Sequence, residues 1–316
     1  MRATARSVSR PKFSLDRAGS GAASPWGMDW LLPLLLALFG PGFADAVLPG
    51  GAAGRGAAGV DIPLSPLGAD ELGPLPRVTA ARAADAPLVV IDPGHGGHDP
   101  GAASPFVASP EKDVTLALGL AIRDALAATG RVRVAMTRED DTYRGLDERY
   151  QIARRLDADL FVSIHADAAP LNDAARGATI YTLSEVASDR QAALLANQQN
   201  GADRIAGTRL SADPGVNMIL IDLAQRESMN NSAEFARLLY REAASVFPFR
   251  PDWHRFAAFV VLKAPDMPSI LFESGYLTNR TDAEYISSAE GRRQIAEGMR
   301  RAIEAHFARR ALGRTG

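Results

Sequence analysis

Short, continuous apolar runs alternate along this chain with longer segments of helical periodicity, and this alternation most constrains the fold. Residues 88–92 form the first apolar run. The next segment begins at Ser109-Pro110, a typical helix cap and first helical residue, and keeps helical spacing as far as Gly130. Strands that alternate with helices favour an α/β sheet covered on both faces.

The remaining elements follow from the same patterns. We predict strands at 132–136, 160–164, 178–183, 258–262 and 270–272, and helices at 146–156, 189–205, 227–247 and 290–308. Functional groups in such sheets gather where strands end.

The first 86 residues differ in composition from the rest of the chain. A basic stretch and a short apolar run, residues 30–39, precede Ala44-Asp45-Ala46. The run is too short to span a bilayer, which needs about 20 residues. We therefore predict a secretory signal peptide over residues 1–46. The Gly-, Ala- and Pro-rich residues 47–86 are predicted to be a flexible linker. The folded domain would cover residues 87–310, with a tail at 311–316.

The composition restricts the chemistry. The chain has no cysteine and five histidines, so a metal site must use His, Asp and Glu. A net charge of −2 argues against a nucleic-acid partner, because phosphate binding needs a basic surface. No second long apolar run follows, so we expect no stable membrane anchor once the signal peptide is removed.

Four side chains lie where the predicted strands and helices begin or end. His95 sits in a Gly-rich loop, Glu111 in the first turn of a helix, and His165 after a buried strand. Two imidazoles and a carboxylate form a His₂Glu set, which is typical of a zinc site that keeps its fourth position open. Glu273 follows another apolar strand, where a carboxylate needs a partner or a task. The pattern is consistent with a metallohydrolase.

Each of these residues also has a structural interpretation. His95 can hydrogen-bond its own loop, and His165 can be a satisfied core histidine. Glu111 can simply be a negative charge at a helix N-terminus, and Glu273 can be an ion-pair partner.

The chain resembles the zinc-dependent N-acetylmuramoyl-L-alanine amidases of the cell-division type in four segments, over roughly residues 86–310. They are VIDPGHGG (90–97), EKD (111–113), SIHAD (163–167) and LFESGYLTN (271–279). The resemblance implies that His95, Glu111 and His165 bind Zn²⁺ and that Glu273 is the catalytic glutamate. It also implies a single domain with a mixed, mostly parallel central sheet flanked by helices, as in zinc exopeptidases.

The resemblance also implies an activity. The expected reaction is hydrolysis of the amide bond between N-acetylmuramic acid and L-alanine of peptidoglycan, in the periplasm, during septal wall splitting. We expect a monomer. Two alternatives remain open: a zinc peptidase that acts on ordinary peptides, and a peptidoglycan-binding protein without catalysis.

A helical regulatory insertion is expected at about 184–257, and its residues 184–207 resemble the regulatory segment of the cell-division amidases. In those relatives a helix covers the zinc site until an activator with a LytM-type domain displaces it. Gln198 and Gln199 stand where some members place a glutamate on zinc, so they are the candidate regulatory residues. Asp92 and Asp167, next to the ligands in sequence, are candidates for orienting the imidazoles.

Overall fold

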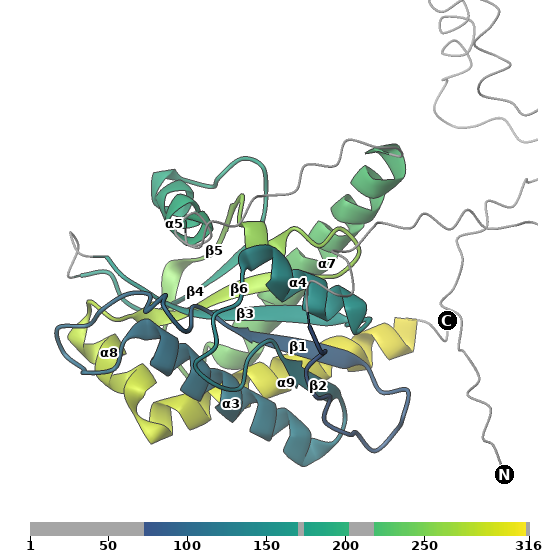
Figure 1. Cartoon of the computed structure of the whole chain (residues 1–316), viewed down its shortest axis with the longest axis horizontal. Helices are drawn as coiled ribbons and strands as arrows, with labels where there is room; N and C mark the ends of the chain where they lie inside the picture. Colours follow the sequence, from purple (N-terminus) through teal and green to yellow (C-terminus); the bar gives the residue numbers. More distant parts are fainter. Residues whose placement is uncertain (1–72, 170–173, 202–217, 314–316) are drawn as a thin grey trace, which may run out of the picture. The chain divides into compact units, whose positions relative to one another are not determined.

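A mixed sheet forms the centre of the fold. The computed structural model describes residues 73–169, 174–201 and 218–313, and within them the sheet has six strands in the order β2-β1-β3-β6-β4-β5 (Figure 1). The strands are β1 (Leu88–Pro93), β2 (Arg133–Met136), β3 (Leu160–Asp167), β4 (Ala178–Leu183), β5 (Phe249–Ala257) and β6 (Ser269–Tyr276). Strand β4 pairs antiparallel with β6, and the other pairs are parallel. The expected mixed, mostly parallel sheet is confirmed.

Helices cover both faces of this sheet. One face carries α3 (Glu111–Thr129), α7 (Met218–Ala243), α8 (Arg280–Ser287) and α9 (Ala289–Gly313). The other carries α4 (Leu146–Arg155), α5 (Arg190–Asn200) and the 3₁₀ turn η1 (Val260–Leu262). Figure 1 shows α4 and α5 on one side of the strands and α3, α8 and α9 on the other. The predicted α/β architecture is thus confirmed.

Burial on both faces explains the continuous apolar runs. In β1, Val89 and Ile91 face the core under α3, while Leu88 and Val90 face the core under α4. Successive side chains of a strand point to opposite faces, so both sets must be apolar. Helix α3 ends at Thr129, and the following Gly130, with a φ of 60°, provides the left-handed cap that glycine adopts without a steric penalty.

The strand order brings the candidate residues together. Strands β1, β3 and β6 are neighbours and run parallel, so their carboxyl ends meet at one edge of the sheet. Their register pairs Asp92 with Ser163 and His165 with Glu273.

Several element boundaries differ from the sequence prediction. His165 and Glu273 lie within β3 and β6, which extend to Asp167 and Tyr276. Helix α3 begins at Glu111 with Pro110 as its N-cap, not at a Ser109 cap. The predicted strand at 258–262 is wrong, because β5 occupies 249–257. Strand β5 pairs only with β4, and its many polar, partly exposed side chains hide the strand pattern.

The predicted regulatory insertion contains two elements of the core fold. Strand β5 belongs to the sheet, and α7 buries Phe235, Ala236 and Leu239 against it. Helical periodicity alone cannot distinguish a helix that completes the core from one that covers a site. Of the described residues between 184 and 257, α5 is the helix on the same face of the sheet as α4.

Both ends of the chain lie partly outside the described residues. The predicted signal peptide, most of the predicted linker and the last three residues lie outside the described residues. Near the end of the linker, Thr79 forms an isolated bridge with Val134, so contact with the domain begins before residue 87. No helix in the described part of the chain is long and apolar enough to cross a membrane.

Candidate metal centre

Three of the predicted site residues converge at the carboxyl edge of the sheet. His95 comes from the loop after β1, Glu111 opens α3, and His165 lies in β3. All three are buried, and one ligand atom from each lies within 4.8 Å of the other two. Glu111 Oε1 is 3.0 Å from His95 Nε2 and 3.2 Å from His165 Nδ1.

This geometry fits a metal ion. Ligand atoms on a tetrahedral zinc lie about 3.3 Å apart, given metal–ligand bonds of about 2.0 Å. The buried Nε2 of His95 makes no hydrogen bond within the described residues, although it faces the Glu111 carboxylate. A buried nitrogen without a hydrogen bond needs an explanation, and a bound cation supplies one. The group can therefore bind a metal ion.

Backbone amides fix the Glu111 carboxylate. Its Oε2 accepts a hydrogen bond from Ala102 N at 2.8 Å, and its Oε1 accepts one from Ala166 N at 3.0 Å. Burial opposes ionisation of Glu111, but His95 and His165 outweigh burial and hold its pKa below the usual range. The side chain is thus held as an anion aimed between the two imidazoles.

A second carboxylate orients His95. Asp99 Oδ2 lies 2.8 Å from His95 Nδ1. A proton on Nδ1 shared with Asp99 leaves the lone pair on Nε2, which faces Glu111. Burial lowers the pKa of His95, but Glu111 and Asp99 outweigh it and raise the pKa to about 9. Metal binding must therefore displace a proton from this imidazole.

The loop that carries His95 is strained, and two arginines hold it. His95 has a φ of 63°, which is rare for a residue other than glycine. Arg149 donates to the carbonyl oxygens of Pro93 and His95, both at 2.8 Å. Arg138 donates to Pro93 O at 3.0 Å and to Gly94 O at 2.7 Å. The two arginines thereby fix the carbonyl groups of three successive residues, of which His95 is the last.

Asp92 supports the same arginine. Its Oδ1 accepts from Arg149 Nη1 at 2.9 Å, and it also accepts from the hydroxyls of Thr137 and Ser163. Burial opposes ionisation of Asp92, but Arg149 and the two hydroxyl groups outweigh it and lower its pKa. Asp92 thus acts on the loop backbone through Arg149, whereas the carboxylate bonded to the His95 ring is Asp99.

Glycine is required where the backbone passes close to the ligands. A Cβ atom at Gly94 would lie 2.3 Å from His165 Cε1. A Cβ at Gly101 would lie 2.6 Å from Glu111 Oε2. No side chain fits at either position without displacing a candidate ligand.

Glu273 faces the same region from β6. It is paired in register with His165, and both carboxylate oxygens are buried without a hydrogen-bond partner within the described residues. Burial, Asp167 and Glu111 raise the pKa of Glu273 well above its usual value. Burial also raises the pKa of Asp167 to about 7. A carboxylate in such surroundings is suited to accept a proton and release it again.

Helix α5 contributes a side chain to a cavity beside the candidate ligands. Gln199 is buried and lines a cavity that His95 and His165 also line, whereas Gln198 is exposed. This cavity offers about 10 Å³ to water-sized molecules, which is about the space of one water. Of the two glutamines predicted to be regulatory, Gln199 is the one at the site.

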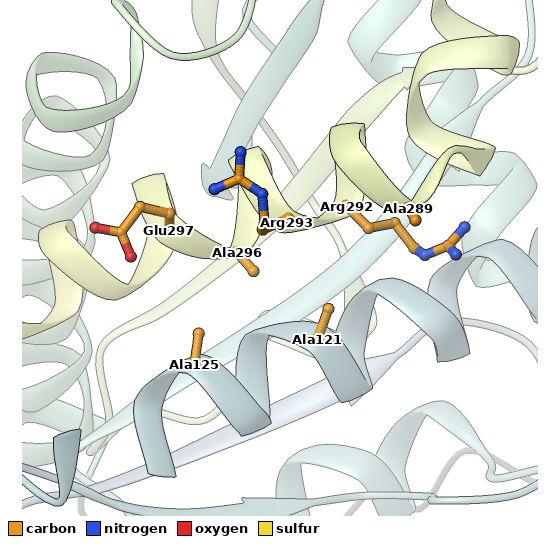
Figure 2. A pocket seen from close by; sticks show the side chains of 7 residues that line it. All are labelled: Ala121, Ala125, Ala289, Arg292, Arg293, Ala296 and Glu297. Atoms are coloured by element: carbon orange, nitrogen blue, oxygen red, sulfur yellow. The ribbon is translucent and has the colours of Figure 1, made fainter. Parts of the chain in front are cut away.

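Another cavity lies away from the ligands, between α3 and α9. Its volume is about 320 Å³, and Figure 2 shows Ala121 and Ala125 of α3 facing Ala296 of α9. Arg293 at its rim is bonded to Glu290. The lining offers no set of groups for hydrolysis, so the metal centre remains the candidate active site.

Comparisons with known proteins give the family. Residues 89–305 match the family model Amidase_3, described as N-acetylmuramoyl-L-alanine amidase. The chain belongs to this family. It is 34% identical to the amidase AmiC of Escherichia coli O6:H1, over 71% of this chain and 54% of AmiC. It is 36% identical to AmiA of Escherichia coli K12, over 70% of this chain and 76% of AmiA. The chain thus spans about half the length of AmiC.

Solved structures of family members share the fold. The catalytic domain of CwlV from Bacillus (Paenibacillus) polymyxa var. colistinus superposes with a TM-score of 0.53, at 24% identity, over 70% of this chain and 98% of that one. AmiC2 of Nostoc punctiforme gives a TM-score of 0.51 at 28% identity, over 70% of this chain and 97% of AmiC2.

Asp99 and Arg138 were not among the site residues predicted from the sequence. Asp99 stands four residues after His95 in the same Gly-rich loop. A carboxylate so close to a candidate ligand could have been predicted to orient its ring. Arg138 follows β2 and reaches the loop only because β2 lies beside β1.

Replacing Asp99 with Asn should weaken metal binding about 10- to 100-fold, because the amide no longer fixes the His95 ring as an anionic partner does. The affinity is measured by competition with a zinc chelator. Asp140→Asn is the matched control, since Asp140 is exposed and bonded to Thr142. Equal affinities of Asp99→Asn and the parent protein would show that Asp99 does not orient the ligand.

Proposed function

We propose that this chain is a zinc-dependent N-acetylmuramoyl-L-alanine amidase. The observation that carries the proposal is the convergence of His95, Glu111 and His165 beside Glu273. Family membership supports the reaction, and the amidase names of AmiC and AmiA support the substrate. The bond to be cleaved is the amide between N-acetylmuramic acid and L-alanine.

The zinc ligands, Glu273 and the residues that hold His95 would have different roles in the reaction. Zinc bound by the three ligands would lower the pKa of a water molecule and polarise the amide carbonyl. Glu273 takes the proton of the attacking water, and its raised pKa lets it hold that proton. It then gives the proton to the leaving amine. Asp99, Arg138 and Arg149 keep the His95 side chain in place during the reaction.

The two alternatives are less well supported. A peptidase for ordinary peptides would use the same groups, but the amidase names of the relatives favour the muramoyl amide. A binding protein without catalysis would not need the complete set of ligands with Glu273 beside them. Release of the stem peptide from muropeptides, compared with cleavage of plain peptides, distinguishes these possibilities.

The N-terminal sequence and the family support a periplasmic location for the enzyme. A signal peptide over residues 1–46 and a linker up to about residue 86 would deliver the domain to the periplasm. There it would act on septal peptidoglycan during cell separation, in response to an activator with a LytM-type domain.

The closed site further supports autoinhibition by α5. A cavity with room for about one water cannot admit a peptidoglycan strand. Gln199 contributes to this closure, and α5 packs on the domain through Ala192, Leu195 and Ala196. Displacement of α5 is then the step that an activator would favour.

Replacing Glu273 with Ala should abolish hydrolysis while zinc is retained, because the proton acceptor is lost and the ligands remain. His165→Ala should lose both zinc and hydrolysis. Metal content and release of stem peptide from muropeptides are measured on both variants. Full activity of Glu273→Ala would overturn the assignment of the general base.

Replacing Leu195 with Asp should raise the basal activity, because a charge at this buried position detaches α5 from the core. Leu194→Asp is the matched control, since Leu194 is 59% exposed and its neighbour Leu195 only 5%. Activity is measured without an activator. A folded Leu195→Asp protein no more active than the Leu194→Asp control would argue against autoinhibition by α5.

A further inference from the structure

Arg255 on β5 and Asp189 at the start of α5 form an ion pair that the proposed hydrolysis does not use. We propose that Arg255 is a binding site for a carboxylate of the substrate peptide, and that Asp189 occupies this site while α5 is closed. The proposal rests on the proposed amidase function, and it adds the part of the substrate that is recognised.

The pair has the geometry of carboxylate recognition. Arg255 Nε donates to Asp189 Oδ2 at 2.9 Å, and its Nη2 donates to Asp189 Oδ1. Two parallel bonds from one guanidinium to one carboxylate give both strength and a defined orientation. The side chain of Arg255 is only 4% exposed, whereas that of Asp189 is 38% exposed. The arginine is therefore part of the domain, and the aspartate approaches it from outside.

The contact with Arg255 also keeps the Asp189 carboxylate ionised. Burial raises the pKa of Asp189, but the bonds from Arg255, Ala192 N and Ser188 outweigh it and lower the pKa to about 2. Asp189 is thus a full anion in this position, as a peptide carboxylate would be.

The domain fixes Arg255 without α5. Its Nη1 donates to Tyr181 Oη at 3.1 Å, and its guanidinium lies over the Tyr181 ring at 5.8 Å. Tyr181 is fully buried in β4. The fork would therefore keep its orientation after α5 has left.

Removal of α5 leaves an unbalanced positive charge. The neighbouring Arg250 is hydrogen-bonded to Tyr276 and Asp252, which are both on the domain. Both arginines also donate to Gln191 of α5, and these bonds are lost with the helix. Arg255 approaches Asp252 only at 3.6 Å, and its two-bond partner is Asp189 on α5. Without Asp189, two arginines face Asp252, and an incoming carboxylate restores the balance.

Arg255 lies on the same face of the sheet as the metal centre. It is paired in register with Tyr181, which is paired with Leu271 of β6. Glu273 is two residues further along β6 and therefore points to the same face as Leu271. Two strand spacings and two residues separate Arg255 from Glu273, about 12 Å between their Cα atoms. An extended peptide covers this distance in roughly three residues.

The substrate class follows from this distance. A stem peptide whose muramoyl amide lies at Glu273 would bring a carboxylate near its third residue to Arg255. The same arginine then serves both states, because it holds α5 by Asp189 in the closed state and the substrate by its carboxylate in the open state.

The test uses Asp189→Asn, which keeps a good helix N-cap but removes the charge, in a protein that also carries Leu195→Asp to detach α5. All variants below are made in this double-variant protein, which is named by Asp189→Asn alone. Two synthetic substrates are compared: an N-acetylmuramoyl tripeptide with a free C-terminal carboxylate as its only peptide carboxylate, and the same compound as a C-terminal carboxamide. In the full-length Asp189→Asn protein, adding Arg255→Gln should raise KM for the acid at least tenfold with kcat unchanged. KM for the carboxamide should not change.

Controls separate recognition from folding. Adding Arg241→Gln, an exposed arginine at the end of α7, should change neither KM. Arg255→Lys keeps the charge without the fork and should give an intermediate KM for the acid; it replaces Arg255→Gln if that variant fails to fold. Equal KM changes for acid and carboxamide, or none for either, would overturn the proposal and leave Arg255 as an attachment for α5 alone.

A binding measurement distinguishes failure of the proposed amidase function from failure of the carboxylate site. If no variant cleaves either compound, calorimetry on the Asp189→Asn protein still measures binding of the intact tripeptides. The acid should then bind at least tenfold more tightly than the carboxamide, and Arg255→Gln should remove the difference. Equal binding of the two compounds by Asp189→Asn would contradict the carboxylate site.

Discussion

The site depends on the contact of one buried carboxylate, Glu111, with the imidazoles of His95 and His165. Its Oε1 lies 3.0 Å from His95 Nε2 and 3.2 Å from His165 Nδ1, and backbone amides of Ala102 and Ala166 hold the carboxylate there. The sheet makes this arrangement possible, because β1 and β3 are parallel neighbours whose carboxyl ends meet where α3 begins. A buried cluster of this kind is stable when a cation or a proton compensates the carboxylate.

The support for the ligands extends well beyond their first contacts. Asp92 holds Arg149, and Arg149 with Arg138 holds the carbonyl groups that precede and include His95. Hydrogen bonds from these two arginines thereby stabilise the positive φ of His95. On the other side of the site, α5 contributes Gln199 to the cavity and Asp189 to Arg255. Under the proposals made above, displacement of this one helix would both open the metal centre and free Arg255.

The sequence predicted the side chains that lie at or just after the ends of the apolar strands and at the start of α3. The apolar runs identified β1, β3 and β6, and the polar residues at their ends proved to converge. Strand β5 was missed because its polar side chains at the sheet edge break the apolar pattern. Asp99 and Arg138 were missed because a single sequence does not show which loops meet in space. The role of α7 was misjudged for the same reason, since periodicity does not show where a helix packs.

The central claim is that His95, Glu111 and His165 together bind zinc. Anomalous diffraction at the zinc edge, from crystals of the purified full-length protein, tests this most directly. We expect one strong peak within about 2.0–2.2 Å of His95 Nε2, a Glu111 carboxylate oxygen and His165 Nδ1. A fully loaded protein whose zinc lies elsewhere, or a protein that takes up no zinc with these three residues intact, would contradict it.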